Sequence, residues 1–249
     1  MCGVVHQISG FLAKDDIKAR LMPNNEVENI LKNSKFNEEH LFTIKGKLDN
    51  EEKILIYPYD EKRLQPAHYE LGLGDEVYVS GDEVPLNLSK RKEGYLVIRP
   101  GEIAILSTQE VVYIPKDLIA FISIKYSHKI KGLVNISGFH VDPGFIGKLL
   151  FTVYNAGPND ILLERSKPVF MIMFAILTKK VEDAYEGEHQ YQLRIKSDDV
   201  ARLHGTPVSP KSLDERVKKV ELWLYVLTAV VIPIIASLLI AVLTRMGGT

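Results

Sequence analysis

Short runs of apolar residues follow one another along the middle of the chain, from Lys53 to Ile195. These runs are rich in β-branched and aromatic residues, as in "KILIY", "DEVYVS" and "KLLFTVYN", and turn residues such as "RPG" and "NAGPND" separate them. Many short strands at close spacing are typical of a sandwich or a barrel. Because no stretch between the runs is long enough for repeated crossover helices, the pattern predicts an all-β domain.

Two stretches before this region have the spacing of helices instead. "LAKDDIKARL" offers Leu12, Ile17 and Leu21 as apolar positions, and "NNEVENILKNS" offers Val27 and Leu31. Apolar residues three to five positions apart, with polar residues between them, are typical of one face of a helix. We therefore expect the β-rich domain to begin with short helices.

The longest apolar stretch lies near the C-terminus. Residues Leu222 to Leu243 contain no charged side chain over 22 positions. A helix of that length extends roughly 33 Å, enough to cross the hydrocarbon core of a bilayer. Transmembrane helices tolerate a residue such as Pro233, and Trp223 lies at one end, where an aromatic belt is expected. The stretch predicts a single-pass transmembrane helix, with a buried core helix as the alternative.

The charges around this stretch predict its orientation. Arg216, Lys218 and Lys219 precede it, and Arg245 follows it. Basic residues accumulate on the cytoplasmic side of membrane helices. We therefore expect a tail-anchored protein whose large N-terminal part lies in the cytoplasm.

These patterns divide the chain into three parts. We expect a β-rich domain over residues 1–195, a linker and short helical stalk over residues 196–221, and the membrane helix over residues 222–243. The stalk is indicated by heptad-like spacing, at positions Leu213, Val217, Val220, Leu224 and Leu227. It either holds several copies together or is a single amphipathic turn that leads into the membrane.

Composition narrows the possible functions. A net charge of -1 over 249 residues gives no support to a nucleic-acid-binding surface, which usually has a basic excess. The single cysteine, Cys2, excludes an internal disulfide and a cysteine-based zinc cluster. His68 and Glu70 form an H-x-E pattern, but a zinc deaminase also needs a C-x-x-C pair. We therefore expect no zinc and no nucleic-acid partner.

Three long segments occur in a fixed order within the β-rich part. They are "YPYDEKRLQPAHYELGLGDEVYV", "IRPGEIAILSTQEVVYIPKDLIAFISIK" and "GFHVDPGFIGKLLFTVYNAGPNDILLE". In order and spacing, from about Ile54 to Leu177, they resemble the dCTP deaminase and dUTPase superfamily, and its deaminase branch most closely. The resemblance implies a distorted β-barrel of the dUTPase-like type and a homotrimer with nucleotide sites between subunits. It also implies Mg²⁺ bound through the nucleotide's phosphates.

The turn "GFHVDPG" holds the first candidate site residues. By the resemblance, Asp142 lies near the nucleotide, and its dUTPase counterpart orients the attacking water. Gly138 and Phe139 begin the turn that closes on the base or the ribose. A carboxylate can accept a proton from water or a hydrogen bond from a sugar hydroxyl. Asp-Pro-Gly is also a turn former in its own right, and Phe139 is equally a packing residue.

Two positions depart from the family pattern. In "KLLFTVYN" the alternation of a strand places Leu150 and Thr152 on one face and Phe151 on the other. The deaminase branch carries at the Thr152 position the Glu that activates water, and a threonine hydroxyl cannot replace a carboxylate base. Gly72 stands where the resemblance implies an arginine. The family mechanism of deamination is therefore expected to be lost or altered.

The phosphate contacts of the family are also changed. The resemblance implies an Arg-Ser-Ser turn with a second Arg shortly after it, and this chain has "SIKYSHKIKG". Lys125 and Ser127 best match the first part, and Lys129 or Lys131 stands in for the second Arg. Lysine holds a phosphate as a point charge but lacks the bidentate fork of arginine. The alternative for these lysines is a solvated strand edge.

Three functions remain open. The first is a nucleotide-binding protein, sensor or effector-like, that passes ligand binding to its membrane helices. The second is an active dCTP deaminase, or a dUTP diphosphatase that depends on Asp142, in pyrimidine deoxynucleotide metabolism. The third is a membrane-tethered trimeric scaffold.

Overall fold

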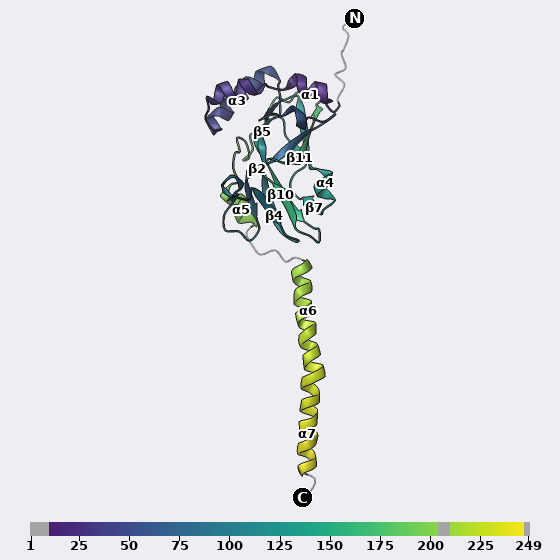
Figure 1. The fold of residues 1–249 in the computed structure, drawn as a ribbon. Coiled ribbons are helices and arrows are strands. Elements are labelled where there is room, and N and C mark those ends of the chain that lie inside the picture. The colour runs from purple at the N-terminus through teal and green to yellow at the C-terminus, as the bar shows by residue number, and fades with distance from the viewer. Residues whose placement is uncertain (1–9, 204–209, 247–249) are drawn as a thin grey trace. The chain divides into compact units, whose positions relative to one another are not determined.

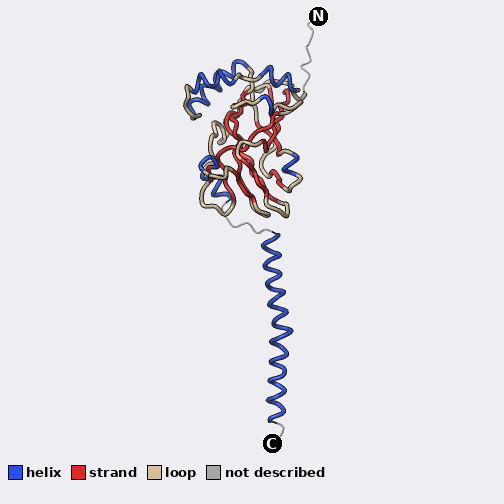
Figure 2. The backbone as a smooth tube through the Cα atoms, in the orientation of Figure 1, coloured by secondary structure: helices blue, strands red, loops and turns tan. Residues whose placement is uncertain are grey.

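The computed structural model describes residues 10–203 and 210–246. The chain divides into two compact units, Met1–Pro207 and Val208–Thr249. The first unit contains the strands and the second is helical (Figures 1 and 2). Cys2 lies outside the described residues. The described part of the first unit, residues 10–203, is called the β unit below.

Within the described residues, nine strands of the β unit pair into one antiparallel sheet, in the order β7-β9-β5-β2-β11-β6-β8, with β1 beside β5 and β3 beside β2. The sheet curls into a half-barrel, and the predicted all-β class is confirmed (Figure 2). A separate antiparallel pair joins β4 to β10. The strands are β1 (Leu55–Tyr57), β2 (Tyr69–Val79), β3 (Leu86–Asn87), β4 (Tyr95–Ile98), β5 (Ile103–Tyr113), β6 (Leu118–Ile124), β7 (Leu133–Asn135), β8 (His140–Val141), β9 (Ile146–Asn155), β10 (Ile161–Glu164) and β11 (Pro168–Ile176).

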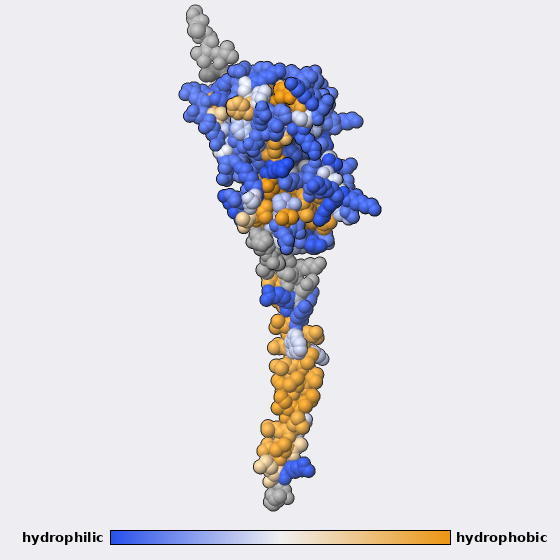
Figure 3. Space-filling model, turned by 90° about the vertical axis from the view of Figure 1, so that its left-hand side faces the viewer, coloured by the Kyte–Doolittle hydropathy of each residue, from blue (hydrophilic) through white to orange (hydrophobic). Residues whose placement is uncertain are grey.

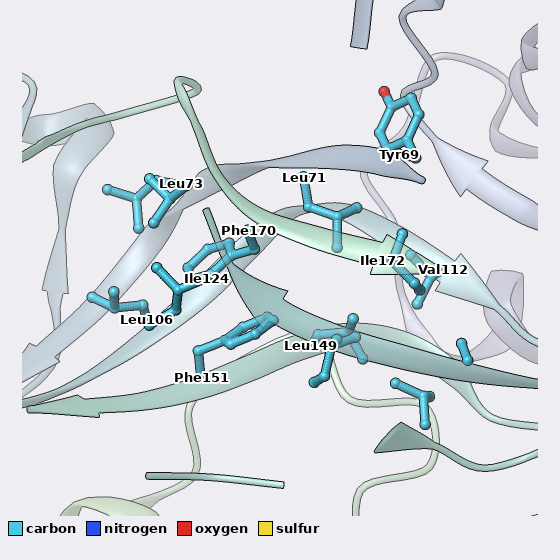
Figure 4. Packing of buried hydrophobic residues seen from close by; sticks show 14 of the residues in the cluster. Tyr69, Leu71, Leu73, Leu106, Val112, Ile124, Leu149, Phe151, Phe170 and Ile172 are labelled. Atoms are coloured by element: carbon cyan, nitrogen blue, oxygen red, sulfur yellow. The ribbon is translucent and has the colours of Figure 1, made fainter. Parts of the chain in front are cut away.

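The main core fills the inside of the curled sheet. Apolar side chains from β2, β5, β9 and β11 point toward one another across it (Figure 4). At its centre the rings of Phe151 and Phe170 stack with centroids 4.0 Å apart. Along β9 every second residue is buried in this core, including Leu149, Phe151 and Val153. The predicted division of the two faces of β9 is therefore confirmed, and it leaves the opposite face for a site.

Short helices precede the sheet, as predicted. α1 (Lys14–Arg20) and α2 (Asn24–Leu31) match the two expected stretches, and α3 (Glu38–Glu51) follows. α3 begins where the Asn37 side chain accepts a hydrogen bond from the His40 backbone N–H at 2.8 Å, which caps the first turn. The helices α1 and α3 lie at one end of the sheet and α5 (Ser197–Leu203) at the other (Figure 1).

The remaining short helices connect strands. η1 (Glu61–Arg63) precedes β2, η2 (Leu88–Lys90) precedes β4, and α4 (Tyr126–Lys129) follows β6. The continuous apolar run "LIAFISIKYS" gave no sign that the strand would stop at Ile124. The strand stops there because Lys125 begins a helical turn, in which the Lys129 N–H donates to the Lys125 carbonyl at 3.1 Å.

The second unit is a long helix made of α6 (Pro210–Val226), the π-helical turn η3 (Leu227–Val231) and α7 (Ile232–Met246). The π turn lies just before Pro233, whose missing N–H and bulky ring disturb the normal ladder. Apolar side chains cover the helix along most of its length (Figure 3). Among the described residues, this helix alone has the length and composition to cross a membrane.

Candidate functional site

A pocket of about 400 Å³ opens on the face of β9 that turns away from the core. Its walls come from β9, from the turn between Ser137 and Asp142, and from the segment between Tyr185 and Leu203. Pockets of this volume are in the range that holds small-molecule ligands. The pocket brings together three of the predicted site residues, Gly138, Asp142 and Thr152.

The floor of the pocket is fixed by the pairing of β9 with β5. Lys148 lies opposite Val111 and Thr152 opposite Ile105, with a register shift between the two pairs. At the shift, the Thr108 hydroxyl oxygen accepts a hydrogen bond from the Leu149 N–H at 3.0 Å. Lys148, Leu150 and Thr152 alternate with core residues and so share the pocket face.

The first wall carries Asp142. The Thr152 carbonyl accepts from the Ile136 N–H at 2.9 Å, which holds the start of this turn against β9. β8 then pairs with β6 and leads into the Asp142 turn. The Asp142 side chain is 48% exposed, and its Oδ1 lies 3.5 Å from Nε2 of His140. The carboxylate is therefore free to meet a ligand, beside an imidazole that sequence analysis did not identify.

The turn after Asp142 needs a glycine. Gly144 has φ +86, and a Cβ built there would lie 2.5 Å from the Cβ of Ala184. A side chain at this position would strain the backbone and push away Ala184. The segment that follows Ala184, from Tyr185 to Leu203, forms the second wall of the pocket. The Asp-Pro-Gly sequence thus forms a turn and places Asp142 in the lining of the pocket.

The second wall is docked by hydrogen bonds to the turn and to β9. The Gln190 side-chain amide donates to the carbonyls of Gly144, at 2.9 Å, and Tyr185, at 2.7 Å, and its oxygen accepts from the Ile146 N–H at 2.9 Å. The Lys148 N–H donates to the Gln192 carbonyl at 2.7 Å. This segment therefore lies alongside the first half of β9.

The second wall ends in α5, within the range that we predicted to be linker. The Glu76 carboxylate accepts from the Ile195 N–H at 2.8 Å, just before the helix. Val200 and Leu203 pack against buried Tyr78 and Ile105. Residues 197–203 are therefore part of the β unit. They add Asp199, Arg202 and Leu203 to the pocket lining.

Sequence reasoning missed most of this lining. His140, Lys148, His189, Gln192, Asp199 and Arg202 all line the pocket. The alternation of β9 was sufficient to find Lys148, because it lies two strand periods from Thr152 on the same face. Nothing in the local pattern brings residues 185–203 back to β9, because that contact depends on long-range packing.

The other predicted nucleotide contacts lie outside this pocket in a single copy of the chain. Lys125 forms an ion pair with Glu70, with Nζ 2.6 Å from Oε1. Ser127 and Lys131 are exposed on and after α4. Phe139 is 64% exposed, and its ring stacks on Phe121 at 6.2 Å. The alternative of a solvated strand edge does not hold at Lys129, since the chain turns into α4 there.

Two charged groups near the floor have shifted pKa values. Burial lowers the pKa of the Lys148 ammonium, and the charges of Asp75, Glu76 and Glu110 partly offset the effect. Burial raises the pKa of Glu110 to about 7, against the opposing effects of the Gly72 N–H and Arg63. Glu110 does not line the pocket. Its carboxylate lies 2.5 Å from the Arg63 guanidinium.

In residues 10–203 and 210–246 no group of three or more His, Cys, Asp or Glu side chains is arranged to hold a metal ion. Asp142 and Asp199 supply carboxylate oxygens to the lining. Such oxygens suit Mg²⁺ when phosphates and water complete its shell.

Comparison with known proteins defines the class. The family model described as "dCTP deaminase-like" matches residues 43–177. This chain therefore belongs to the dCTP deaminase-like family, as the resemblance predicted.

Individual relatives agree. The dCTP deaminase of Pyrococcus abyssi (strain GE5 / Orsay) is 33% identical over 143 residues, which cover 57% of this chain and 90% of that protein. The "dCTP deaminase, dUMP-forming" of Methanobrevibacter smithii is 32% identical over 160 residues, covering 57% of this chain and 82% of that protein. The similarity thus spans most of each relative.

Solved structures give weaker matches. The 2'-deoxycytidine 5'-triphosphate deaminase from Agrobacterium tumefaciens superposes with a TM-score of 0.47 and 18% identity, covering 68% of this chain and 48% of that chain. The dUTPase of EIAV superposes with a TM-score of 0.33 and 15% identity, covering 49% of this chain and 97% of that chain. This chain therefore spans about half of the first protein and nearly all of the second.

Proposed function

We propose that this chain is a membrane-anchored, dCTP deaminase-like protein that binds a nucleotide in the pocket beside β9, with deaminase activity lost or altered. Thr152 carries the proposal. It lines the pocket with Asp142, at the position where the resemblance implies the water-activating Glu. A hydroxyl has no useful basicity near neutral pH, and loss of a general base typically lowers a rate by about 10²–10⁴-fold.

The active assembly in this proposal is a homotrimer. Lys125, Ser127, Lys131 and Phe139 lie outside the pocket of their own copy, and Phe139 is exposed. In a trimer with sites between subunits, these residues would reach the pocket of a neighbouring copy. Mg²⁺ would arrive on the phosphates of the ligand, and zinc has no role.

The proposal places the long apolar helix in a bilayer, with the β unit in the cytoplasm. The Thr228, Ser237 and Thr244 hydroxyls donate to carbonyls of their own helix at 2.8–2.9 Å, which satisfies them in an apolar surrounding. Leu203 lines the pocket, and α6 begins seven positions later at Pro210. In sequence, α5 is therefore the last described element before the long apolar helix. If the protein acts as a sensor, its ligand must bind with different affinities to two arrangements of the protein.

Full-length protein in detergent tests the proposal. We expect dCTP and dUTP, incubated with Mg²⁺, to remain unchanged in chromatography while binding to the protein is measurable by calorimetry. Asp142→Asn should weaken that binding. Conversion of dCTP or dUTP at a rate typical of enzymes, about 1 s⁻¹ or more, would contradict the loss of activity.

Thr152→Glu is the matched gain-of-function variant. We expect it to raise dCTP deamination above the wild-type level, because it returns a carboxylate to the pocket face of β9. Thr152→Gln has the same size without the basicity and should show no gain. No gain with Glu would mean that the changed phosphate contacts also limit the reaction.

One observation favours an active enzyme as the second candidate. The half-exposed Asp142 carboxylate lies 3.5 Å from His140 in the pocket, and a carboxylate with an imidazole can orient and deprotonate water. A dCTP deaminase or dUTP diphosphatase would then depend on Asp142 in place of the missing Glu. A membrane-tethered scaffold is the third candidate, and measurable nucleotide binding would count against it.

A further inference from the structure

Lys148 places a cation on the pocket face of β9. It shares that face with Thr152, four residues further along. At the usual rise of a strand, the two positions are about 13 Å apart. The backbone of Lys148 is held on both sides, because its N–H donates to Gln192 at 2.7 Å and its carbonyl accepts from the Gln192 amide at 3.3 Å. The base of the side chain is therefore fixed relative to the pocket.

The carboxylates around this ammonium have other partners. Asp75 pairs with Arg165, and Glu110 pairs with Arg63. Glu76 accepts the Ile195 N–H at 2.8 Å through one oxygen. Within the part of the chain that the structure describes, Lys148 forms no ion pair of its own. The charges of Asp75, Glu76 and Glu110 therefore act on the Lys148 ammonium from a distance without neutralising it.

A half-buried cation without a direct partner is costly to the free protein. Burial lowers the pKa of Lys148 for this reason. An apolar side chain of the same length would remove the cost, and Leu150 already places an apolar side chain on the same face of β9. The lysine therefore lowers the stability of the protein when the pocket is empty and favours the binding of an anion.

We propose that Lys148 is an anion-recognition residue of this pocket, which binds a phosphate or carboxylate group of a ligand that extends along β9 toward Thr152. The proposal rests on the proposed binding function of the pocket and deepens it, because it states which class of ligand the pocket takes. Lysine suits this task as a point charge that accepts varied anion geometry. A phosphorylated nucleoside is long enough to reach both positions. The predicted phosphate contact Lys125 is paired with Glu70 instead.

Full-length protein in detergent, with and without Lys148→Met, provides the test. Thermal unfolding of the β unit is measured alone and with deoxycytidine, dCTP or inorganic triphosphate. We expect the free variant to unfold at the wild-type temperature or above it, because a desolvated cation is gone. In Lys148→Met, the apparent affinity for dCTP and for triphosphate, taken from the shift in unfolding temperature, should fall at least tenfold. The shift caused by deoxycytidine should stay unchanged. Lys148→Arg should keep most of the binding, and Lys179→Met, an exposed lysine, should change nothing.

Each alternative outcome has a separate meaning. A less stable free variant with unchanged triphosphate binding would make Lys148 a structural residue and overturn the proposal. A wild-type protein that responds to none of the three compounds would overturn it as well. A wild-type protein that binds triphosphate through Lys148 but shows no preference for dCTP would support the anion site. The same result would count against the proposed nucleotide-binding function of the pocket.

Discussion

Two neighbouring regions of the β unit, on adjacent strands, each hold a charged side chain away from solvent, one fully buried and one half-buried, and the two differ in how their charge is compensated. Glu110 on β5 is fully buried, but it accepts from Arg63 at 2.5 Å and from the Gly72 N–H at 2.9 Å. Lys148 on the adjacent strand β9 has charges around it but no direct ion-pair partner among the described residues. Buried charges that stabilise a fold are paired. The first region is therefore structural, and the second is a candidate for ligand binding.

Gly72 belongs to the structural region. A Cβ at Gly72 would lie 2.8 Å from Nη1 of Arg63 and 2.7 Å from Oε1 of Gln109. The glycine thus leaves room for Arg63, which also donates to the Ser166 carbonyl at 2.7 Å. The arginine that the resemblance implies at position 72 is missing, and the guanidinium beside this position comes from η1.

Arg63→Met should have the largest effect on stability. It leaves Glu110 buried without its cation, and breaking a buried pair in this way typically costs about 3–5 kcal/mol. We expect a loss near the lower end, about 3 kcal/mol, because Arg63 is partly exposed. Urea unfolding followed by near-UV circular dichroism measures it. Arg165→Met breaks the exposed pair with Asp75 and should cost about 0.2–1 kcal/mol; equal losses in the two variants would remove the distinction between the regions.

The pH dependence of stability should carry the signature of Glu110. Its pKa is raised from 4.5 to about 7 in the folded state, so the folded protein binds the proton more tightly than the unfolded chain. This contribution is fully present below pH 4.5 and is lost as the pH rises through 7, by about 1–3 kcal/mol in total. Glu110→Gln, which resembles the protonated acid, should flatten unfolding curves measured between pH 4.5 and 7.5. A wild-type protein that becomes more stable across this window would contradict the prediction.

The pocket wall should depend on neutral hydrogen bonds rather than on charge. Gln190→Leu removes three hydrogen bonds to Gly144, Tyr185 and Ile146, and leaving such groups unpaired costs about 1–3 kcal/mol. The loss should be local, since this side chain meets only the first residue of β9 and the loops beside it. Hydrogen exchange should rise in residues 185–203 and stay unchanged in β2 and β11. Uniform exchange across the β unit would mean that the wall and the sheet unfold together.

The smallest effect should be the contribution of Lys148 to the stability of the protein at alkaline pH. Its folded-state pKa is lowered from 10.5, so the folded protein gives up this proton more easily than the unfolded chain. The free energy of unfolding should therefore rise as the pH approaches 10.5, while Lys148→Met should lose this rise. Unfolding between pH 7 and 10, with Lys179→Met as the control, measures the difference. Identical slopes in wild type and Lys148→Met would show that the ammonium is not held at a cost.

The sequence predicted the parts of the site that lie within one local pattern. Asp142, Gly138 and Thr152 were named through the family resemblance. All three line the pocket, because one turn carries the first two and strand alternation puts Thr152 on the pocket face of β9. His189 and Arg202 were missed because their region has no repeating pattern. Ser127 lies on the helical turn α4, which the local pattern did not indicate.

The amino-acid sequence by itself determined the all-β class, the short N-terminal helices, the apolar C-terminal helix and the family, because each depends on residue order over short distances. Tertiary structure decided that α5 lines the pocket and that Arg63 pairs with Glu110 over 47 positions. It also decided that Lys148 has no such partner among the described residues. The physical reason is that pairing and burial depend on which distant segments pack together. A lysine in an alternating strand has the same local pattern whether its charge is compensated or left for a ligand.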